Sequence, residues 1–572
     1  MRWMVASVVV VLLVAWGALV AARVWSAYRH DQRGLAVLTT VRSNLDPSTL
    51  TASTTERSLR SAAGEFSAAH ADLSGPLVAP ATWLPVFGRQ LRSARSLSSA
   101  AQQVATIGST FLVQVHDILD QPHGAGPERV QSLRHLSALS ATAVHQLYAV
   151  DTGPGQALVG PLARKHDQFV SQLVDARNRL ATAAGVSAVV ATILQGPQTY
   201  LVLASNNAEM RSGAGAFLEV GTADTSGGTI HLGVFGPSGA QALAPGQVTV
   251  VGDLQRNWGW LEPGVDWRNL GLTPQFDVNA ALASRMWAAR TGQQVDGVLS
   301  VDVAGLRQIL TATGPVQAGG VTIDSGNVEQ YILHDQYAGL SNDSAGNAAR
   351  ADSLGLIAHE VLRQLQGQST ELRTLASAVA GAVAGRHLMV WSAAPAAQAA
   401  WVASGASGGL TPRSLGVAVI NRGGNKLDQF LHVSVRLDTR RVGNTTAVTM
   451  TTKLANQTPD GQAPFIAGPF PGLPLVYGDY SGLIADNLPG AATDISMAGA
   501  GSLTAEGAEG PTWLVAAPVL VHQGSSSTVV VRFRLPGTHG SMTIVPSARI
   551  PAEEWSYQGA HVTDERPVTF SW

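Results

Sequence analysis

The chain begins with a long uncharged segment. Residues 4–22, MVASVVVVLLVAWGALVAA, contain no charged side chain over 19 positions, and a helix of about 20 apolar residues crosses the hydrocarbon core of a bilayer. The alternative is a cleaved signal peptide, with Val20, Ala21 and Ala22 as a small-residue cleavage site. The apolar region of a signal peptide is usually only about 7–15 residues long. The length therefore favours an uncleaved anchor, and residues 1–34 are predicted to form the anchor and its flank.

The charges beside this anchor and the size of the chain predict opposite orientations. Arg2 precedes the uncharged segment, whereas Arg23, Arg29 and Arg33 follow it, so the positive-inside rule alone would keep the rest of the chain in the cytoplasm. A single N-terminal anchor in front of a long, soluble-type sequence usually exports that sequence. We expect a single-pass protein of the cell membrane whose bulk is extracytoplasmic.

From residue 35 to residue 195 the apolar positions follow a helical period. Spacings of three and four residues recur and give each helix one apolar face. Proline and glycine at Pro122, Gly124 and Gly153 to Gly155 separate the helical segments. The pattern predicts an antiparallel bundle of about four helices. Its polar faces hold no clustered carboxylates or histidine pairs, so we expect a spacer or an interaction surface.

After Pro197 the pattern changes to short β-branched and aromatic runs that alternate with helical segments. Strand-like runs occupy residues 200–204, 248–253 and 295–301 and are separated by glycine-rich turns. Alternating strands and helices indicate a parallel or mixed sheet covered by helices. Residues 196–410 are therefore predicted to form an α/β domain.

The run from 295 to 301 leads directly into a helix with clear end signals. Asp302 is placed to cap a helix over residues 303–313, and Gly314 followed by Pro315 ends such a helix. Because Asp302 also lies where a strand ends, it is one of the candidate ligand-binding residues.

From about residue 415 onward the helical period is gone. Six or seven short runs of alternating apolar and polar residues are separated by Gly, Asn, Pro and Ser turns. Such a series is typical of an antiparallel β-sandwich with one packed and one solvated face on each sheet. We predict this sandwich over residues 411–572, as a module that binds or docks.

Composition excludes several classes of function. Charged residues make up 13% of the chain, against about 25% in typical soluble proteins. A net charge of −2 and a pI of about 6.7 give no basic field for nucleic acid. The sequence contains no cysteine, so disulfides, thiolate metal sites and cysteine nucleophiles are excluded.

The stretch 199–217 places polar groups between two strand-like runs. Asn206, Asn207 and Arg211 follow the first run, and a loop of small residues leads into the second. Loops at strand ends present binding groups, and glycines there let the backbone approach a ligand closely. We predict these three residues as ligand-binding candidates. The alternative is a solvated hairpin in which Arg211 pairs with Glu209.

A second group of candidates lies among tryptophans. Asp253 and Arg256 are close in sequence to Trp258, Trp260 and Trp267. Aromatic faces beside charged groups suit sugar ligands, whereas a partly buried loop cluster is the alternative.

Two patterns of catalytic sites are incomplete. Residues 405–409 match the G-x-S-x-G turn of serine hydrolases, but the required buried strand does not precede them. His359 and Glu360 begin a zinc-binding pattern, but Arg363 stands where the second histidine is required. We therefore assign no catalytic residue and no metal ligand, and we expect no cofactor.

Four stretches occur in the order seen in a known bacterial family. They are residues 83–90 (WLPVFGRQ), 205–217 (SNNAEMRSGAGAF), 286–316 and 421–431 (NRGGNKLDQFL). Together they resemble the membrane-anchored domain-of-unknown-function family 4012, over nearly all of the chain beyond the anchor. The resemblance implies an envelope protein that is often associated with surface polysaccharide.

Residues 295–316 and the pair Arg211–Ser212 carry a more distant resemblance. They are similar to parts of the LytR-CpsA-Psr phosphotransferases, which move glycopolymers from polyprenyl-pyrophosphate carriers to the cell wall. Gly213 and Ala214 replace the Asp and Thr of that family, and its Ser-Ile-Pro-Arg-Asp stretch is missing. The resemblance implies an α/β domain of that type with a related pocket.

The leading hypothesis is a membrane-anchored protein that binds cell-surface glycopolymer or assists its assembly without catalysis. One alternative is a divergent phosphotransferase that acts on polyprenyl-pyrophosphate-linked glycan, using Arg211, Asp253 and Arg256 with Mg²⁺. The other is a purely structural envelope scaffold. Whether the protein is an enzyme stays open at this point.

Overall fold

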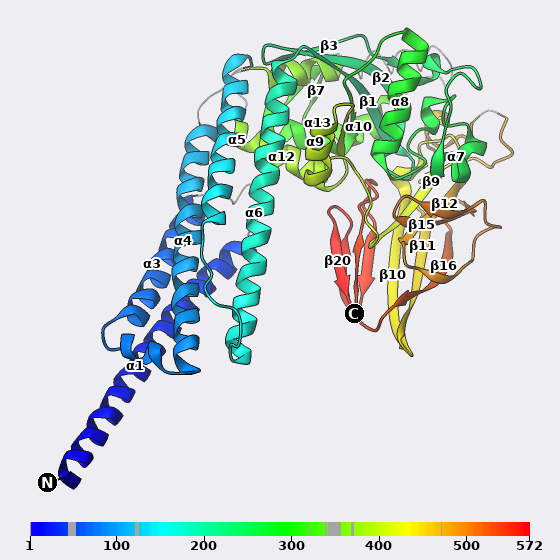
Figure 1. Ribbon diagram of the computed structural model, residues 1–572. Helices are drawn as coiled ribbons and strands as arrows, with labels where there is room; N and C mark the ends of the chain where they lie inside the picture. The colour runs from blue at the N-terminus through cyan, green and yellow to red at the C-terminus, as the bar shows by residue number, and fades with distance from the viewer. Residues whose placement is uncertain are drawn as a thin grey trace. The chain divides into compact units, whose positions relative to one another are not determined.

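The computed structural model describes residues 2–43, 53–120, 125–318, 320–337, 340, 356–367, 371–470 and 472–572. Cα distances divide the chain into two compact units (Figure 1). The first unit comprises Met1–Pro122 and Gln131–Ala191, and the second comprises His123–Val130 and Thr192–Trp572. The two units are described separately below.

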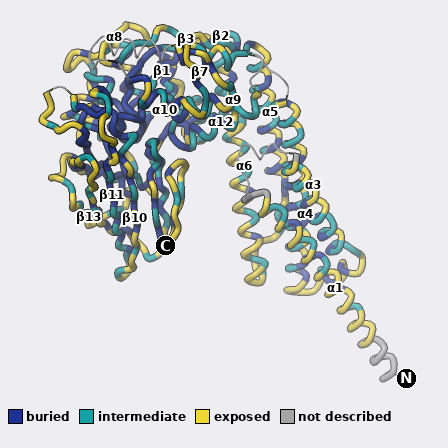
Figure 2. Tube along the Cα trace, turned by 180° about the vertical axis from the view of Figure 1, so that it is seen from behind, coloured by how far each residue is buried: buried dark blue, intermediate teal, exposed yellow. Residues whose placement is uncertain are grey.

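The first unit is helical, as the apolar period predicted. Helix α3 packs against both α1 and α4. The candidate membrane span lies in α1, where Val11–Thr40 is long and apolar enough to cross a bilayer. Figure 2 shows exposed positions along the part of α1 that extends beyond the other helices. The helices are α1 (Arg2–Ser43), α3 (Ser53–Ser74), the 3₁₀ turn η1 (Ala79–Trp83), α4 (Phe87–Leu119), α5 (Pro127–Tyr148) and α6 (Gly160–Gln195), the last two extending into the second unit.

The second unit begins with a mixed sheet in the order β3-β2-β1-β5-β8. Strands β1 and β5 are parallel, whereas β1 and β2 form an antiparallel hairpin. The α/β pattern predicted for this region is confirmed. The strands are β1 (Gln198–Met210), β2 (Gly215–Ser226), β3 (Thr229–Leu232), β4 (Gly236–Pro237), β5 (Gly297–Val301) and β8 (Leu388–Ser392), with a separate hairpin of β6 (Val316–Ala318) and β7 (Val321–Ile323).

Helices pack around this sheet. The cap predicted at Asp302 is confirmed, because its side chain accepts a hydrogen bond from the Gly305 amide at the start of α9. The strand predicted at 248–253 is wrong: Gly252 has a positive φ of 69° and starts helix α7, which buries Leu254 and Trp258 in the core. The helices are α7 (Gly252–Trp258), α8 (Phe276–Thr291), α9 (Val303–Thr313), α10 (Val328–Leu333), α12 (Leu372–Ala384) and α13 (Pro395–Ser404), and residues 356–365 are also helical.

The C-terminal part is rich in β-structure, as predicted, and forms two six-stranded sheets. Their orders are β13-β16-β11-β10-β18-β19 and β14-β15-β12-β9-β17-β20. Most pairs are antiparallel, but β10–β18 and β9–β17 are parallel, which the predicted antiparallel arrangement did not include. The strands are β9 (Ser414–Asn421), β10 (Leu431–Val442), β11 (Thr445–Asn456), β12 (Tyr480–Pro489), β13 (Thr493–Ala498), β14 (Ala505–Glu509), β15 (Thr512–Val521), β16 (Ser526–Pro536), β17 (Ser541–Ile544), β18 (Glu554–Tyr557), β19 (Ala560–Thr563) and β20 (Val568–Ser571).

The α/β and β-rich parts share one hydrophobic core. Leu201 and Phe217 of the first sheet belong to the same buried cluster as Ile420, Leu483 and Ala516 of the C-terminal strands. The fold type therefore changes near residue 410 while the core continues across that position. The domain boundary at 410/411 stays a prediction.

Candidate functional site

The predicted candidates at the end of β1 lie in the interior. Asn206 donates from Nδ2 to the Tyr337 hydroxyl at 2.8 Å, and its Oδ1 accepts from the Ala208 amide at 2.8 Å. Asn207 is fully buried. Its Nδ2 donates to Asp302 Oδ2 and to the Ala548 carbonyl, both at 2.7 Å. The amide groups of both asparagines therefore hold the protein's own segments together.

Asp302 links Asn207 to a histidine. One of its oxygens caps α9 through the Gly305 amide at 2.8 Å, and the other contacts both Asn207 Nδ2 and His387 Nδ1, the latter at 2.8 Å. Burial opposes the charged form of His387, but the charge and hydrogen bond of Asp302, with help from Asp564, raise the pKa of His387 above 6.5. The arrangement is a buried carboxylate–imidazole pair at the start of a helix.

Arg211 does not form the predicted alternative pair with Glu209. Its Nε donates to the Arg268 carbonyl at 2.8 Å, and its Nη1 donates to the carbonyls of Met210 at 2.9 Å and Asn421 at 3.2 Å. The guanidinium is buried, and burial lowers its pKa to about 10. The solvated-hairpin interpretation is wrong because the hairpin end is covered by the β-rich part of the same unit.

Glu209 pairs with Lys426 instead. Both side chains are buried, and the Lys426 ammonium also lies 5.7 Å from the ring centre of Tyr337 and 5.9 Å from that of Phe465. Burial lowers the pKa of Lys426 to about 7, against the opposing charge of Asp428. An ammonium between aromatic faces and a carboxylate is a cation–π arrangement that stabilises a desolvated charge.

Asp428 is the centre of the remaining contacts. Its Oδ1 accepts from Arg549 Nη1 and from the Tyr480 hydroxyl, both at 2.8 Å. Its Oδ2 accepts from the Met210 amide at 3.0 Å and from Asn421 Nδ2 at 2.9 Å. Sequence reasoning did not select Asp428 as a site residue, although the stretch 421–431 that contains it was recognised. We name this whole cluster the buried joint: Asn206, Asn207, Glu209, Arg211, Asp302, His387, Asn421, Lys426, Asp428, Tyr480 and Arg549.

Asp253 and Arg256 lie apart from the buried joint. They pair with each other on α7, and Asp253 Oδ2 also accepts from the Gly510 amide at 2.7 Å. Among the described residues, neither contacts Arg211. The structure thus brings Asn207 and Asp302 into direct contact but does not assemble the six candidates into one site. Their ligand-binding role stays a prediction.

Metal binding at these carboxylates has no structural support. Within the described ranges, no group of three or more His, Asp or Glu side chains is arranged to hold a metal ion. The Mg²⁺ of the phosphotransferase alternative therefore finds no ligand set there.

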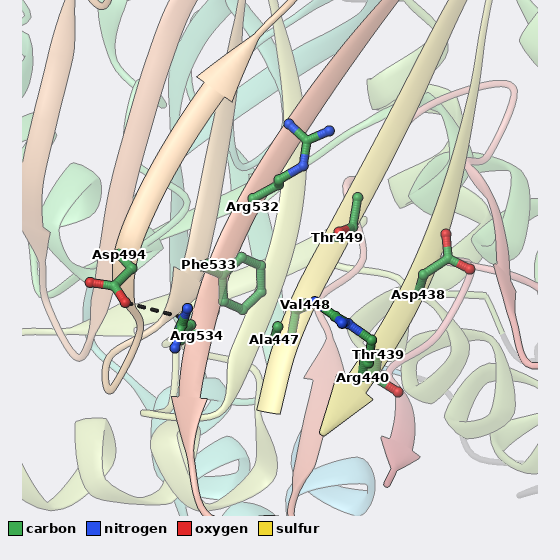
Figure 3. Close-up of a pocket in the computed structure, with 10 residues that line it drawn as sticks. All are labelled: Asp438, Thr439, Arg440, Ala447, Val448, Thr449, Asp494, Arg532, Phe533 and Arg534. Atoms are coloured by element: carbon green, nitrogen blue, oxygen red, sulfur yellow. Dashed lines mark ion pairs between the residues drawn. The ribbon is translucent and has the colours of Figure 1, made fainter. Parts of the chain in front are cut away.

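A different polar site lies on the outer face of the sheet that contains β10, β11 and β16. It is an open pocket of about 410 Å³, and Figure 3 shows its side chains coming from these strands and from the β13 region. We name it the arginine trough. It is lined by Asp438, Thr439, Arg440, Ala447, Val448, Thr449, Asp494, Arg532, Phe533 and Arg534.

Strand register explains the shape of the arginine trough. Arg440 on β10 lies opposite Ala447 on β11, which lies opposite Arg534 on β16. In the next row of outward positions, Thr449 lies opposite Arg532. Small side chains on the central strand thus form a floor, and arginines on both neighbouring strands form the walls.

Within the described ranges, only one of the three arginines in the trough has an acidic partner. Arg534 pairs with Asp494 at 3.2 Å, the contact drawn as a dashed line in Figure 3, and Asp438 is engaged by Arg436 at 3.1 Å. Arg440 and Arg532 are exposed and have no carboxylate partner in the described part of the chain. Sequence reasoning missed them, although arginines at alternate strand positions were a visible signal.

Taken together, these features define a chain of two compact units, with one candidate membrane span in the part that the structure describes. The model of the family described as "Protein of unknown function (DUF4012)" matches residues 195–337, which contain the stretches 205–217 and 286–316. This match supports the resemblance to that family over residues 195–337.

Other comparisons add little. No curated protein sequence matches the chain. The X-ray structure of the Lin1025 protein from Listeria innocua is 11% identical in sequence, and the match covers 37% of this chain and 80% of that chain with a TM-score of 0.21. A TM-score at this level does not establish a common fold.

Proposed function

We propose that the protein is a membrane-anchored, extracytoplasmic binding protein for an anionic cell-surface glycopolymer, and that it acts without catalysing a reaction. The arginine trough is the observation that carries this proposal. Two exposed guanidinium groups, Arg440 and Arg532, lie beside a floor of small residues and have no carboxylate partner among the residues that the structure describes. Guanidinium groups bind carboxylates and phosphates through paired, charge-assisted hydrogen bonds.

The spacing of the trough suits a repeating ligand. Arg440 and Arg534 are two strands apart, or about 10 Å at the usual strand spacing, and Arg532 is one outward position further along β16. A polymer with an anionic group on each repeat would contact several arginines at once. Several weak contacts on one chain give a much higher affinity than any of them alone.

The contacts of the two candidate arginines favour binding over catalysis. Of the cations that a phosphotransferase would use, Arg211 is bonded to three backbone carbonyls and Arg256 is paired with Asp253. A pyrophosphate needs several free arginines. A phosphotransferase is the alternative function, and the experiment described next tests it as well.

We also propose a finer description of the fold. The two C-terminal sheets pack face to face as a β-sandwich, because Val433 and Phe533 of one sheet share a buried cluster with Leu415 and Ile484 of the other. The strand–helix unit of β5 and α9, parallel to β1, supports a distant relation of the α/β part to the LytR-CpsA-Psr fold.

The test compares two double variants of the full-length protein in lipid nanodiscs. Arg440→Ser with Arg532→Ser removes the free guanidinium groups, and Arg290→Ser with Arg566→Ser removes two exposed charges elsewhere in the second unit. The probes are polygalacturonate, poly(glycerol phosphate) and neutral dextran, measured by titration calorimetry. An exposed charged contact contributes about 0.5–1 kcal/mol, so the first variant should bind the anionic probes about 5- to 30-fold more weakly.

The outcomes separate the candidate functions. The control variant and the neutral probe should show no comparable change. Equal weakening in both variants, or no affinity for either anionic polymer, would contradict the proposed site. Turnover of a polyprenyl-pyrophosphate-linked glycan by the wild-type protein would favour the phosphotransferase instead.

A further inference from the structure

The turn between α3 and α4 is unusually apolar for a connection between helices. Residues 75–88, GPLVAPATWLPVFG, contain no charged residue. Trp83 is 87% exposed and Val86 is 75% exposed, and Leu84 and Phe87 are also exposed. Contiguous exposed apolar surface of this kind marks an interaction site for protein or membrane. We name residues 75–88 the apolar turn.

The apolar turn packs along α1 inside the first unit. Trp16 Nε1 donates to the Leu77 carbonyl at 2.9 Å. Val78 and Ala81 share a buried cluster with Val20 of α1. Near the end of α3, Asp72 pairs with Arg23 at 2.8 Å. The turn therefore lies beside residues 16 to 23 of the same helix that is the candidate membrane span.

Together the turn and α1 line an open apolar pocket of about 600 Å³. The stacked rings of Trp25 and Tyr28 lie on its α1 side. Its lining contains no charged residue: Trp16, Gly17, Val20, Ala21, Val24, Trp25, Tyr28, Ala81, Leu84 and Phe87.

Helix length then decides where the turn must lie. At about 1.5 Å per residue, residues 4–15 rise only about 18 Å as a helix, whereas the hydrocarbon core of a bilayer is about 30 Å thick. If α1 crosses the bilayer, residues 16–23 must provide most of the remaining thickness. The apolar turn lies beside these residues and must enter the bilayer with them.

We infer that the apolar turn is a second membrane-inserted element, and that lipid acyl chains occupy the pocket between it and α1. It lies in the leaflet on the side of the helical bundle, and the Arg23–Asp72 pair and the Arg92 side chain, which reaches the Thr82 carbonyl, lie at its charged border. Exposed Trp83, Trp25 and Tyr28 are residues that favour the membrane interface. The inference rests on the membrane anchoring of α1, which is part of the proposed function.

The backbone of the turn is suited to an apolar environment. Polar backbone groups inside a bilayer must be satisfied within the protein. The amides of Val78, Ala81 and Gly88 donate to carbonyls within the turn at 2.9–3.0 Å. Three prolines in the turn have no N–H to satisfy, and the side chain of Arg92 donates to the Thr82 carbonyl.

The absence of cysteine from the sequence permits a direct test. Single cysteines are introduced as Trp83→Cys and Val86→Cys in the turn, as Leu13→Cys in α1 and as Thr106→Cys on an exposed position of α4. Each variant of the full chain is labelled with a polarity-sensitive fluorophore in nanodiscs. Quenching is measured with nitroxide-labelled lipids and with aqueous iodide, and circular dichroism checks that each variant is folded.

The expected result is blue-shifted emission and strong lipid quenching at positions 13, 83 and 86, and iodide quenching at position 106. Lipid quenching at position 13 with iodide access at both 83 and 86 would overturn the inference while leaving the anchor intact. Iodide access at position 13 would show that α1 is not inserted, and both the anchor and the inserted turn would then be rejected.

Discussion

The buried joint and the arginine trough are both polar clusters, yet they differ in whether their charged side chains have partners within the protein. In the joint, Asp428 and Arg549 are almost fully buried and bonded to each other, and Asp428 accepts four hydrogen bonds. In the trough, Arg440 and Arg532 are exposed and lack acidic partners among the described residues.

The difference separates a structural role from a binding role. A buried ion must be fully bonded, because an unpaired charge in the interior costs several kcal/mol. Such bonding leaves little capacity for a ligand. An exposed arginine is stable in water without a partner, so it remains free to bind an anion. The side chains that first attract notice in the sequence are therefore mainly those that join two parts of the fold.

The largest expected effect follows from removing the charge at the centre of the joint. Asp428→Asn keeps the size of the side chain but leaves Arg549 buried without its counter-ion. The free energy of unfolding of the second unit should fall by about 3–5 kcal/mol. Urea denaturation followed by the fluorescence of the buried tryptophans measures this change.

The matched control is Asp438→Asn in the trough. Asp438 is exposed and pairs with Arg436 on the same strand, so the loss should be at most about 1 kcal/mol. Equal decreases in the free energy of unfolding of Asp428→Asn and Asp438→Asn would contradict the distinction between the two clusters.

Local structure was predictable from sequence where its causes are local. The helix 303–313 begins after Asp302 and ends at Gly314 as predicted, because a side-chain cap and a glycine act within a few residues. The partners of Asn207 and Arg211 were not predictable in this way. Asp302 and Arg268 come from distant segments of the α/β part, and Ala548 and Asn421 come from the β-rich part that packs on the first sheet.

The arginine trough was also only partly predictable from the sequence. Alternation along each strand predicted β-structure in this region, and that prediction is confirmed. The trough exists because β11 lies between β10 and β16 in a particular register. Register and strand order arise from distant segments, so alternation within one strand could not identify the neighbours of Arg440.

A smaller effect is expected from the pH dependence of the joint. The pKa of His387 is raised in the folded protein, so its charged form stabilises the fold below pH 6.5, the ordinary value, and this contribution is lost as pH rises through the raised value. One hydrogen bond to a charged group contributes about 1.5–3 kcal/mol. His387→Gln should therefore be less stable than the wild type at acidic pH, with the difference shrinking as pH rises.

The midpoint of urea unfolding is measured for the wild type and for His387→Gln from acidic pH upward. Asp302, Asp564, Arg307 and Glu329 are charged groups that interact with His387, and they are the same in both proteins. Lys426 changes the free energy of unfolding in the opposite direction as pH rises. Its pKa is lowered to about 7 in the folded protein, so the free-energy cost of burying it decreases between pH 7 and 10.5. Lys426 is present in both proteins, so its contribution cancels in the stability difference between His387→Gln and the wild type. A stability difference that does not change with pH would exclude the proposed role of His387.

The smallest expected effect on stability comes from substitutions in the arginine trough. This effect contrasts most strongly with the effect of Asp428→Asn in the buried joint. Arg440→Ser with Arg532→Ser should change the free energy of unfolding by no more than about 0.5 kcal/mol, because exposed positions without partners contribute little. The wild-type affinity for an anionic polymer should also fall steeply with salt, since the screening length drops from about 10 Å at 0.1 M to about 3 Å at 1 M. The stability loss of Asp428→Asn should persist in the same salt series, because buried pairs are screened much less. If the trough variant instead loses more than about 1 kcal/mol of stability, or if polymer binding does not depend on salt, the arginines are structural and the contrast between the two clusters fails.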